Sequence, residues 1–335
     1  MTLLIGTSNG VFTADASGTT QEVEGLAGRE VRALRASNGT IYAGAENGVY
    51  TSKNGGHSWK KSGVEGKIVW DIAPAPGDER TIYVGTQPAA LFRTKDGGES
   101  WAEIDSMRRI PGSEKWCVPN SDAGARARTL VLDARDPSRY WVGLEVGGVL
   151  GTGDDGATWS SVMTGGDIHV MAADPSRPGV LYMTTGFGRY PDDPQPREER
   201  IAGAFRSKDA GRTWEYLWKG IEPPYTRPMC VDDRAPYALT IGCAPTAFAS
   251  YKDEGGAKSR LYQTTDAGDT WNDLGDKDHS PSAACILAVS PAPEGPGQVL
   301  VGTDTGEVWR VTPDKAWTLL VSGLPAVQSV LALDE

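Results

Sequence analysis

The sequence of 335 residues lacks any hydrophobic run long enough to cross a membrane, for which a helix needs about 20 consecutive apolar residues. Cysteine is scarce: the four residues, at positions 117, 230, 243 and 285, are spread out with no metal-binding spacing. These absences argue against a membrane protein and a disulfide framework, and they predict reduced thiols.

Basic residues are fewer than acidic residues. The chain has 33 Lys and Arg against 44 Asp and Glu, which gives a net charge of -11. A general nucleic-acid-binding protein needs a basic stripe on its surface, so this class is disfavoured, whereas a local cationic pocket is still compatible with the composition. The first residues lack the basic segment and cleavage site of a signal peptide, and we expect a cytoplasmic protein.

What the chain has in abundance is glycine and proline, with 42 and 22 residues among short runs of aromatic and β-branched residues. This composition is typical of an all-β protein with many turns. One pattern, Ser/Thr-x-Asp/Asn-x-Gly-x-x-Trp, occurs five times, and we call these segments the octapeptide turns. They occupy residues 52–59, 94–101, 152–159, 207–214 and 264–271.

The residue types in the octapeptide turns predict a structural role. The Asp or Asn side chain accepts hydrogen bonds from backbone groups a few residues on, and the Gly tolerates a positive φ. The Trp buries a large apolar surface under the hairpin. We therefore expect each turn to staple a β-hairpin and assign no catalytic residue to it, His57 included.

The octapeptide resembles the Asp-box of BNR-repeat propellers. Over nearly its whole length the chain is similar to the seven-bladed, sialidase-like group, which also includes sortilin-type receptors, photosystem II assembly factors and xyloglucan hydrolases. The resemblance implies the fold, whereas activities differ within the group. True sialidases carry Phe/Tyr-Arg-Ile-Pro before the first Asp-box, but here Arg109-Ile110-Pro111 follows the second. Xyloglucan hydrolases pair two propellers, and this chain supplies one.

The segments between the octapeptide turns repeat the plan of a four-stranded blade. Seven such repeats predict an all-β, seven-bladed β-propeller in a single domain, residues 1–335. The N-terminal residues match the second strand of the other repeats, and residues 329–333 match the first. We therefore expect the C-terminal strand to join blade 1 as its innermost strand, which closes the ring and removes both free sheet edges.

Alignment of the repeats on the glycine of their second strands places one residue of each blade at the mouth of the central channel. Three arginines and a histidine then converge, and such cations repel one another unless an anion or acidic side chains lie among them. In order from blade 1 to blade 7, the aligned residues are Ser329, Arg32, Trp70, Arg128, His169, Arg227 and Cys285.

A second ring, at the ends of the second strands, contains acidic residues and leaves two interpretations open. Pairing of Arg32 with Glu46 and of Arg128 with Glu145 would seal the channel with ion pairs. Alternatively, the ring binds a ligand. Arg227 has no acidic partner in this alignment, so we assign it to a ligand carboxylate or phosphate, which suits its planar fork. The second ring comprises Ser8, Glu46, Gln87, Glu145 and Asp304.

Among the aligned residues, His169 is the only histidine and the leading candidate for a general acid/base, with Glu145 or Asp167 to orient it. Cys285 is a candidate nucleophile if the cations lower its pKa, and otherwise an inert core thiol. Two ligands, His169 and Glu145, are too few for a metal site, and no cofactor is indicated. The catalytic candidates are His169, Glu145 and Tyr190, and the ligand-binding candidates are Arg32, Trp70, Arg128, Arg227 and Cys285.

Long insertions at 106–124, 186–200, 221–225 and 246–251 are expected on the face of the channel mouth, where their aromatic residues form a lid or pack the loops onto the propeller. Tyr190, with Asp192 or Asp193, would reach the site from the second of them. Two functions remain open. One is a hydrolase, glycosidase-like, or a lyase that acts on a small anionic substrate; the other is a non-catalytic scaffold that binds a protein partner.

Overall fold

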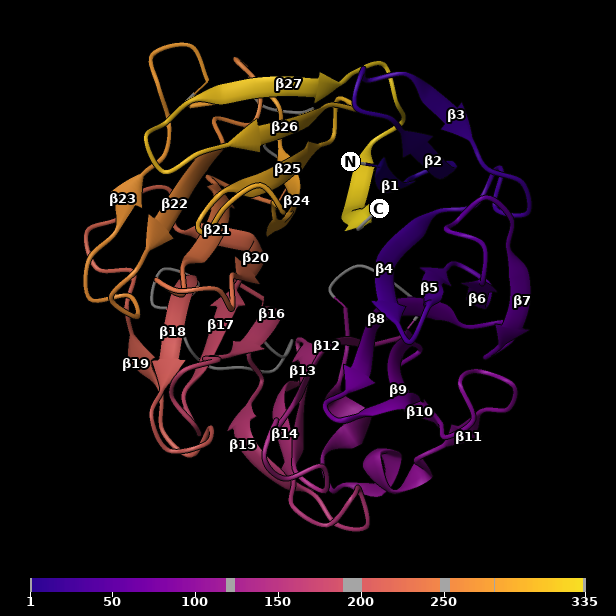
Figure 1. Ribbon diagram of the computed structural model, residues 1–335. Coiled ribbons are helices and arrows are strands. Elements are labelled where there is room, and N and C mark those ends of the chain that lie inside the picture. The colour runs from indigo at the N-terminus through magenta and orange to yellow at the C-terminus, as the bar shows by residue number, and fades with distance from the viewer. Residues whose placement is uncertain (1, 119–123, 189–200, 248–253, 280, 334–335) are drawn as a thin grey trace.

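The computed structural model describes residues 2–118, 124–188, 201–247, 254–279 and 281–333. They form seven four-stranded antiparallel sheets around a central axis, as Figure 1 shows, and this confirms the predicted seven-bladed all-β propeller. The helices in the described residues are the short 3-10 segments η1 (Asp105–Arg109) and η2 (Ser113–Lys115). No helix in this part of the chain is long and apolar enough to span a bilayer.

In blades 2 to 7 the four strands lie in sequence order from the axis outwards. In blade 1 the innermost strand comes from the C-terminal part of the chain. Blade 1 contains β28 (Val327–Leu333), β1 (Thr2–Thr7), β2 (Gly10–Ala14) and β3 (Thr20–Glu22); blade 2 contains β4 (Val31–Ser37), β5 (Thr40–Ala45), β6 (Gly48–Ser52) and β7 (Lys60–Gly63); blade 3 contains β8 (Ile68–Ala75), β9 (Asp78–Gln87), β10 (Leu91–Thr94) and β11 (Ala102–Glu103); blade 4 contains β12 (Arg126–Leu132), β13 (Tyr140–Glu145), β14 (Gly148–Thr152) and β15 (Ser160–Thr164).

The remaining three blades have the same plan. Blade 5 contains β16 (Ile168–Ala173), β17 (Leu181–Thr185), β18 (Gly203–Ser207) and β19 (Glu215–Tyr216); blade 6 contains β20 (Tyr225–Val231), β21 (Leu239–Ala244), β22 (Arg260–Thr264) and β23 (Asn272–Asp273); blade 7 contains β24 (Ile286–Pro291), β25 (Val299–Thr303), β26 (Val308–Val311) and β27 (Trp317–Val321). The predicted closure is confirmed, because β28 pairs antiparallel with β1 as the innermost strand of blade 1.

The five octapeptide turns share one hydrogen-bond pattern. In the copy at 207–214, the backbone N–H of Gly211 donates to Ser207 Oγ at 2.8 Å, and that of Thr213 donates to Asp209 Oδ1 at 2.8 Å. The other four copies make the equivalent bonds. Hydrogen bonds from Thr213 lower the pKa of Asp209 to about 2, so the carboxylate is a structural acceptor at neutral pH.

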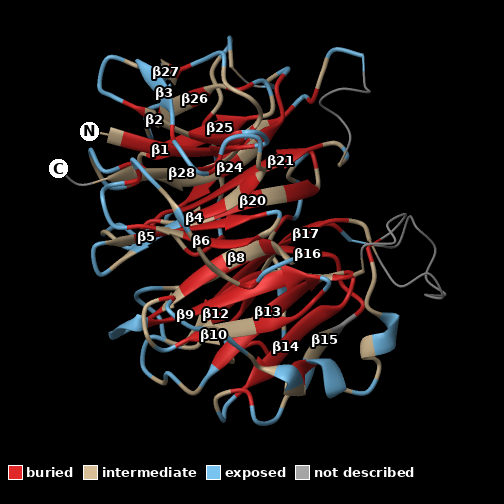
Figure 2. Cartoon of the chain, turned by 90° about the vertical axis from the view of Figure 1, so that its right-hand side faces the viewer, coloured by how far each residue is buried: buried red, intermediate tan, exposed pale blue. Residues whose placement is uncertain are grey.

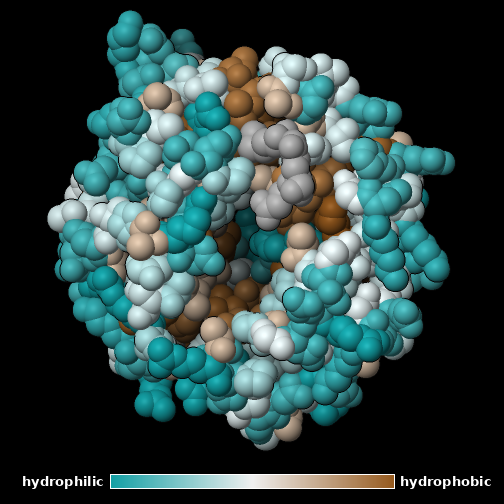
Figure 3. All heavy atoms as spheres, in the orientation of Figure 1, coloured by the Kyte–Doolittle hydropathy of each residue, from teal (hydrophilic) through white to brown (hydrophobic). Residues whose placement is uncertain are grey.

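Close approach of neighbouring blades depends on the glycine of the second strand. A Cβ atom added to Gly85 in β9 would lie 2.3 Å from the carbonyl oxygen of Ala127 in the next blade, and one added to Gly44 would meet the side chain of Val69. Apolar clusters between blades bury the strands, which Figure 2 shows as a buried interior with exposed turns. The central channel opens as a hollow in the face seen in Figure 3.

Opposite these glycines, each innermost strand carries a β-bulge, where one extra residue interrupts the pairing. The interruption falls on Arg32, Trp70, Arg128 and His169 in blades 2 to 5, and on Arg227 with Pro228 in blade 6. The alignment made from the sequence is therefore correct for five blades.

In blades 1 and 7 the alignment is displaced. The bulged residues there are Gln328 and Leu287, whereas Ser329 is paired with Gly6 and Cys285 precedes β24. These two repeats lack an octapeptide turn, which in the other five repeats gives a second marker of the register besides the strand glycine. Ser329 and Cys285 are both buried.

Candidate functional site

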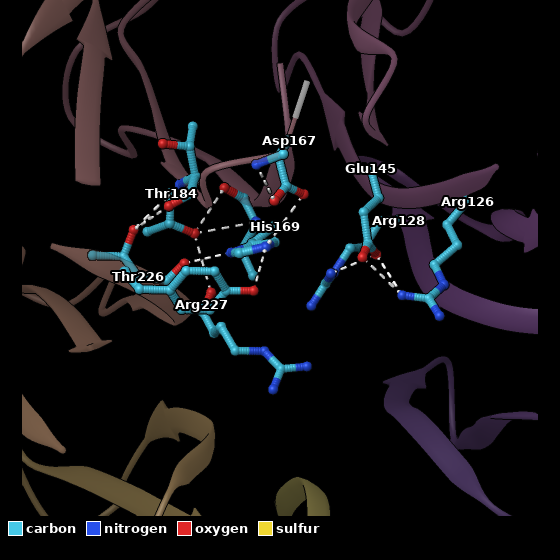
Figure 4. A network of polar contacts seen from close by, with 12 residues as sticks. Arg126, Arg128, Glu145, Asp167, His169, Thr184, Thr226 and Arg227 are labelled. Carbon is cyan, nitrogen blue, oxygen red and sulfur yellow. Dashed lines mark hydrogen bonds and ion pairs between the residues drawn. The ribbon is translucent and has the colours of Figure 1, made fainter. Parts of the chain in front are cut away.

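The bulged residues lie near the starts of the innermost strands, at the end of the channel opposite the octapeptide turns. First and third strands of a blade run in the same direction, because both pair antiparallel with the second, and the octapeptide turn follows the third strand. The site is therefore built at one end of the channel by residues from blades 2 to 6 (Figure 4), and we call it the axial site.

Trp70 supports the cations of the axial site. The guanidinium carbon of Arg32 lies 3.9 Å from the centre of its ring, that of Arg126 lies 4.2 Å away, and that of Arg128 lies 5.3 Å away. The indole N–H donates to Gln87 Oε1 at 3.2 Å. Cation–π contacts of this kind are each worth about 0.5–2 kcal/mol, so Trp70 holds the arginines in place.

Glu145 binds two arginines at once. Arg126 donates to both of its carboxylate oxygens, at 2.8 and 2.7 Å, and Arg128 donates to Oε2 at 2.6 Å. Burial would raise the pKa of Glu145, but Arg128 and Arg126 outweigh this effect and lower it. The predicted pair of Arg128 and Glu145 is confirmed. Arg126 was missed because it lies two residues before the aligned position, although alternation along the strand would place both side chains on one side.

One interpretation of the sequence paired Arg32 with Glu46, and this ion pair is not formed. The guanidinium of Arg32 contacts the carboxylate of Glu30, which precedes the strand, while Glu46 is exposed. The bulge at position 32 is not the cause, because Arg128 lies at an equivalent bulge and does reach Glu145; in blade 2, Glu30 offers Arg32 a carboxylate two residues away. Burial lowers the pKa of Arg32 to about 10, with Glu30 opposing the shift and repulsion from Arg126, Arg128 and Arg227 adding to it.

Within the described residues, Arg227 differs from Arg32, Arg126 and Arg128, each of which contacts a glutamate. Among the described residues, no carboxylate lies within ion-pair distance of its side chain. Figure 4 shows its guanidinium pointing away from His169 and Asp167, with no contact drawn to it. Its side chain is half-buried, and its charge repels that of Arg32.

His169 is enclosed rather than open to the channel, with 1% of its surface exposed. Nδ1 contacts the carbonyl oxygen of Thr226, and since a carbonyl only accepts, Nδ1 carries a proton. Nε2 lies 3.2 Å from the hydroxyl of Tyr225 and 3.4 Å from Asp167 Oδ1. Both ring nitrogens are thus engaged, and the carboxylate beside the ring belongs to Asp167, not to Glu145.

Asp167 is held as a carboxylate. Burial would raise its pKa, but His169 and Arg128 lower it to about 2, and the backbone N–H of Gly188 donates to Oδ2 at 3.0 Å. Tyr225, which sequence reasoning did not place at the axis, packs against His169 with ring centres 5.0 Å apart. Its pKa is raised to about 12, mainly by burial, so the hydroxyl is neutral.

Two other candidates have different outcomes. Tyr190 lies outside the described residues, as do Asp192 and Asp193. The condition for a nucleophilic Cys285 is not met, because burial raises the pKa of its thiol in spite of Arg227. Its backbone N–H donates to Asp304 Oδ1 at 2.7 Å, and the side chain belongs to a small buried apolar cluster.

The insertions are described in part. Trp116 packs against the apolar cluster of blades 3 and 4, which supports the simpler of the two interpretations for this residue. Phe187 contacts Tyr225, with ring centres 6.1 Å apart, and so lies beside the axial site. Phe248 and Tyr251 lie outside the described residues, and the predicted lid stays a prediction.

Several polar atoms around the axis have no hydrogen-bond partner within the described part of the chain. They are Arg32 Nε, Asp167 Oδ1 and Ser329 Oγ, all of them buried. Within the described ranges, no group of three or more His, Cys, Asp or Glu residues could hold a metal ion.

Comparisons with known proteins support the fold. No family model matches the chain. It is 23% identical over 238 residues to the oligoxyloglucan-reducing end-specific xyloglucanase of Emericella nidulans, a match of 61% of this chain and 26% of that protein. The GH74 xyloglucanase from Xanthomonas campestris superposes with a TM-score of 0.70 at 19% identity, covering 95% of this chain and 52% of that one.

The extracellular domain of a putative hybrid two-component system from B. thetaiotaomicron superposes with a TM-score of 0.60 at 12% identity, covering 98% of this chain and 37% of that one. The chain thus spans about a quarter of the curated relative and about half or less of the two solved structures. At these identities the similarity shows a shared propeller fold, and the sialidase-like assignment stays a prediction.

Proposed function

We propose that this propeller binds a small anionic ligand at the axial site, with Arg227 making the principal contact. The observation that carries the proposal is the arrangement of Arg227. Its guanidinium extends into the channel mouth without a carboxylate partner among the described residues, next to arginines that are already fixed by Trp70 and Glu145.

The charges of the axial site favour an anion. Four arginines are grouped with the carboxylates of Glu30, Glu145 and Asp167, and two of the arginines share Glu145. Cations removed from water are costly unless each is paired, so an anion bound here would offset repulsion that the side chains leave uncompensated. Guanidinium groups suit carboxylate and phosphate oxygens through paired hydrogen bonds.

Binding is better supported than acid–base catalysis at this site. Both nitrogens of His169 are engaged, and its ring is buried. Glycoside hydrolysis uses a carboxylic acid that stays protonated until it donates, which needs a raised pKa, but the pKa values of Glu145 and Asp167 are lowered. A hydrolase or lyase activity with His169 as acid/base is thus the weaker candidate. The protein-docking role also lacks a specific observation, since residues 189–200 are outside the described ranges.

The proposal is tested by titrating the protein with acetate, succinate and inorganic phosphate at constant ionic strength, with calorimetry and thermal melting as readouts. We expect saturable binding of at least one anion and a rise in melting temperature. The change Arg227→Gln should weaken the tightest of these interactions about tenfold or more, since charged hydrogen bonds are worth about 1.5–3 kcal/mol.

The matched control is Arg310→Gln. Arg310 lies in β26, 2.8 Å from Glu294, where both side chains are about one-third exposed. This change removes the same charge away from the axis and should leave anion binding unaltered. Absence of saturable binding for every anion, or equal affinities for the wild type and Arg227→Gln, would show the proposal to be wrong.

A further inference from the structure

The segment of blade 6 that carries Arg227 is held by the neighbouring blade. We infer that blade 5 positions Arg227 for its ligand, with Thr184 of β17 and His169 of β16 as the positioning residues. This inference rests on the proposed anion-binding function and adds the residues that fix the place of its principal arginine.

The first observation is that blade 6 leaves more of this segment without cross-strand partners than the preceding blades do. In blades 2 to 5 a single residue interrupts the pairing of the innermost strand. In blade 6 both Arg227 and Pro228 lie outside the pairing with β21. Pro228 has no N–H to donate, and it restricts the residue before it to extended backbone. The place of Arg227 therefore depends on contacts from outside its own sheet.

The second observation is a threonine where the other blades have a glycine. In six blades the residue of the second strand at the bulge is glycine, whereas in blade 5 it is Thr184. The Thr184 hydroxyl accepts a hydrogen bond from the backbone N–H of Val170 at 3.2 Å and donates to the carbonyl oxygen of Arg227 at 3.0 Å. A glycine could make neither bond. The glycines of the other blades are Gly6, Gly44, Gly85, Gly143, Gly242 and Gly302.

The third observation is that His169 holds the residue before Arg227. Its Nδ1 donates to the carbonyl oxygen of Thr226. On the other side of the ring, Nε2 lies 3.2 Å from the hydroxyl of Tyr225 and 3.4 Å from Asp167 Oδ1, and these contacts keep Nδ1 turned towards Thr226. Side chains of blade 5 thus hold two successive carbonyl groups of blade 6, as Figure 4 shows.

Burial makes these bonds effective. Thr184 and Thr226 have none of their surface exposed, and His169 has 1% exposed, so water does not replace a lost partner there. Thr226 adds a further bond to blade 5, because its hydroxyl donates to the carbonyl oxygen of Gly203 at 2.8 Å. An arginine whose backbone is fixed in this way loses less conformational entropy when it binds an anion.

Calorimetric titration of the whole chain with acetate, succinate and inorganic phosphate tests the inference. Thr184→Val keeps the shape of the side chain and removes its hydroxyl. Because a looser segment spends less time in the orientation that binds, this change should weaken the tightest of these interactions about two- to tenfold, the range of one neutral hydrogen bond. Thr184→Ser keeps a hydroxyl and should restore most of the affinity.

The matched control is Thr240→Val. Thr240 is also fully buried in a second strand, β21, and its hydroxyl oxygen accepts a hydrogen bond from Gln263 Nε2 at 2.9 Å. It pairs with Gln263 immediately before the octapeptide turn at 264–271, at the end of the blade away from the axial site. The control should lower the melting temperature as Thr184→Val does, and it should leave anion affinity unaltered.

Two amide variants separate the roles of the two nitrogens of His169. Asn places its amide near the position of Nδ1 and can still donate to Thr226, whereas Gln places its amide near Nε2. His169→Gln should therefore weaken anion binding more than His169→Asn does. A role in packing alone predicts the opposite order, because Gln is closer to His in volume.

Each alternative outcome has a distinct meaning. If the wild type binds none of the anions, the proposed function fails together with the inference. If Arg227→Gln weakens binding but Thr184→Val does not, the anion site stands and positioning by blade 5 is wrong. Equal losses of affinity in Thr184→Val and Thr240→Val, or a greater loss in His169→Asn than in His169→Gln, would also overturn the inference.

Discussion

Glu145 is the residue on which the geometry of the axial site depends most. It lies at the end of β13 and fixes two guanidinium groups, one through both of its oxygens and one through Oε2. A carboxylate in this position determines where Arg126 and Arg128 stand and how much of their charge is left for a ligand. It is therefore a positioning residue for the proposed function.

Replacement of Glu145 by Gln should destabilise the protein by about 3 kcal/mol, since removal of one partner from a buried ion pair leaves uncompensated charge. Succinate or phosphate should restore part of the loss, because an added anion takes the place of the missing carboxylate. Urea denaturation with and without the anion measures both effects. Glu294→Gln, which breaks a more exposed pair, should cost about 1 kcal/mol or less. Equal stabilities of the two variants would contradict this account of Glu145.

At the residue scale, the sequence predicted positions better than partners. Alignment placed Arg227 and Arg128 correctly and identified Glu145, because the strand glycines repeat with a constant register. It failed for Arg32, whose partner is Glu30, and it missed Arg126. Glu30 and Arg126 each lie two residues before the aligned position, and an alignment of one position in each blade does not include them.

At the scale of the strand, packing between blades explains why a glycine recurs at the position used for alignment. In β9, Gly85 faces the innermost strand of the next blade so closely that a Cβ atom has no room. The partner strand, β12, carries Arg126 and Arg128, so the distance between these two blades also positions half of the axial site. A repeat glycine with no obvious function in the sequence thus sets the geometry of the site.

Gly85→Ala should therefore destabilise the protein by about 1–3 kcal/mol, the usual cost of excess volume in a packed interior. The obstacle is the backbone carbonyl of Ala127, 2.3 Å from the new Cβ atom, which cannot turn away as a side chain would. Gly153→Ala is the control, since nothing lies within 4 Å of its added Cβ atom, and we expect a change within about 0.5 kcal/mol. Urea melts of both variants decide the point; similar losses in both would argue against close blade contact at Gly85.

The octapeptide turns were predictable for a different reason. Their hydrogen bonds join residues four positions apart, so the motif contains all of its own partners. The insertions offer no such local rule: Trp116 packs on the core of its blades, and Phe187 reaches the axis. Nothing in their spacing distinguishes the two cases, because the contacts are made with distant parts of the chain.

At the scale of the whole molecule, ring closure follows from the missing first strand of blade 1. The sequence predicted that the C-terminal residues supply it, and β28 does so, with Leu331 opposite Leu4. Residues of β28 also belong to the apolar cluster shared with blade 7. One strand therefore completes a sheet and joins the two ends of the ring, a common solution to the problem of free sheet edges.

Deletion of residues 327–335 should consequently do more than remove one strand. It exposes the edge of β1 and uncovers apolar residues of blades 1 and 7, among them Leu3, Ile5 and Leu300. We expect loss of the cooperative thermal transition and aggregation, measured by calorimetry and light scattering. Because the axial site needs arginines from blades 2, 4 and 6 at fixed separation, anion binding should disappear as well.

A circular permutant distinguishes the loss of closure from the mere presence of a chain break. Thr2 pairs with Leu333 near the two ends of the chain, so a short linker can join the ends, and new ends can be opened at residues 65 and 66, which are exposed between blades 2 and 3. This protein keeps β28 in place and should retain both a cooperative melt and anion binding, since exposed turns tolerate breaks. If the permutant unfolds while the deletion variant still melts cooperatively, β28 is not the element that holds the ring together.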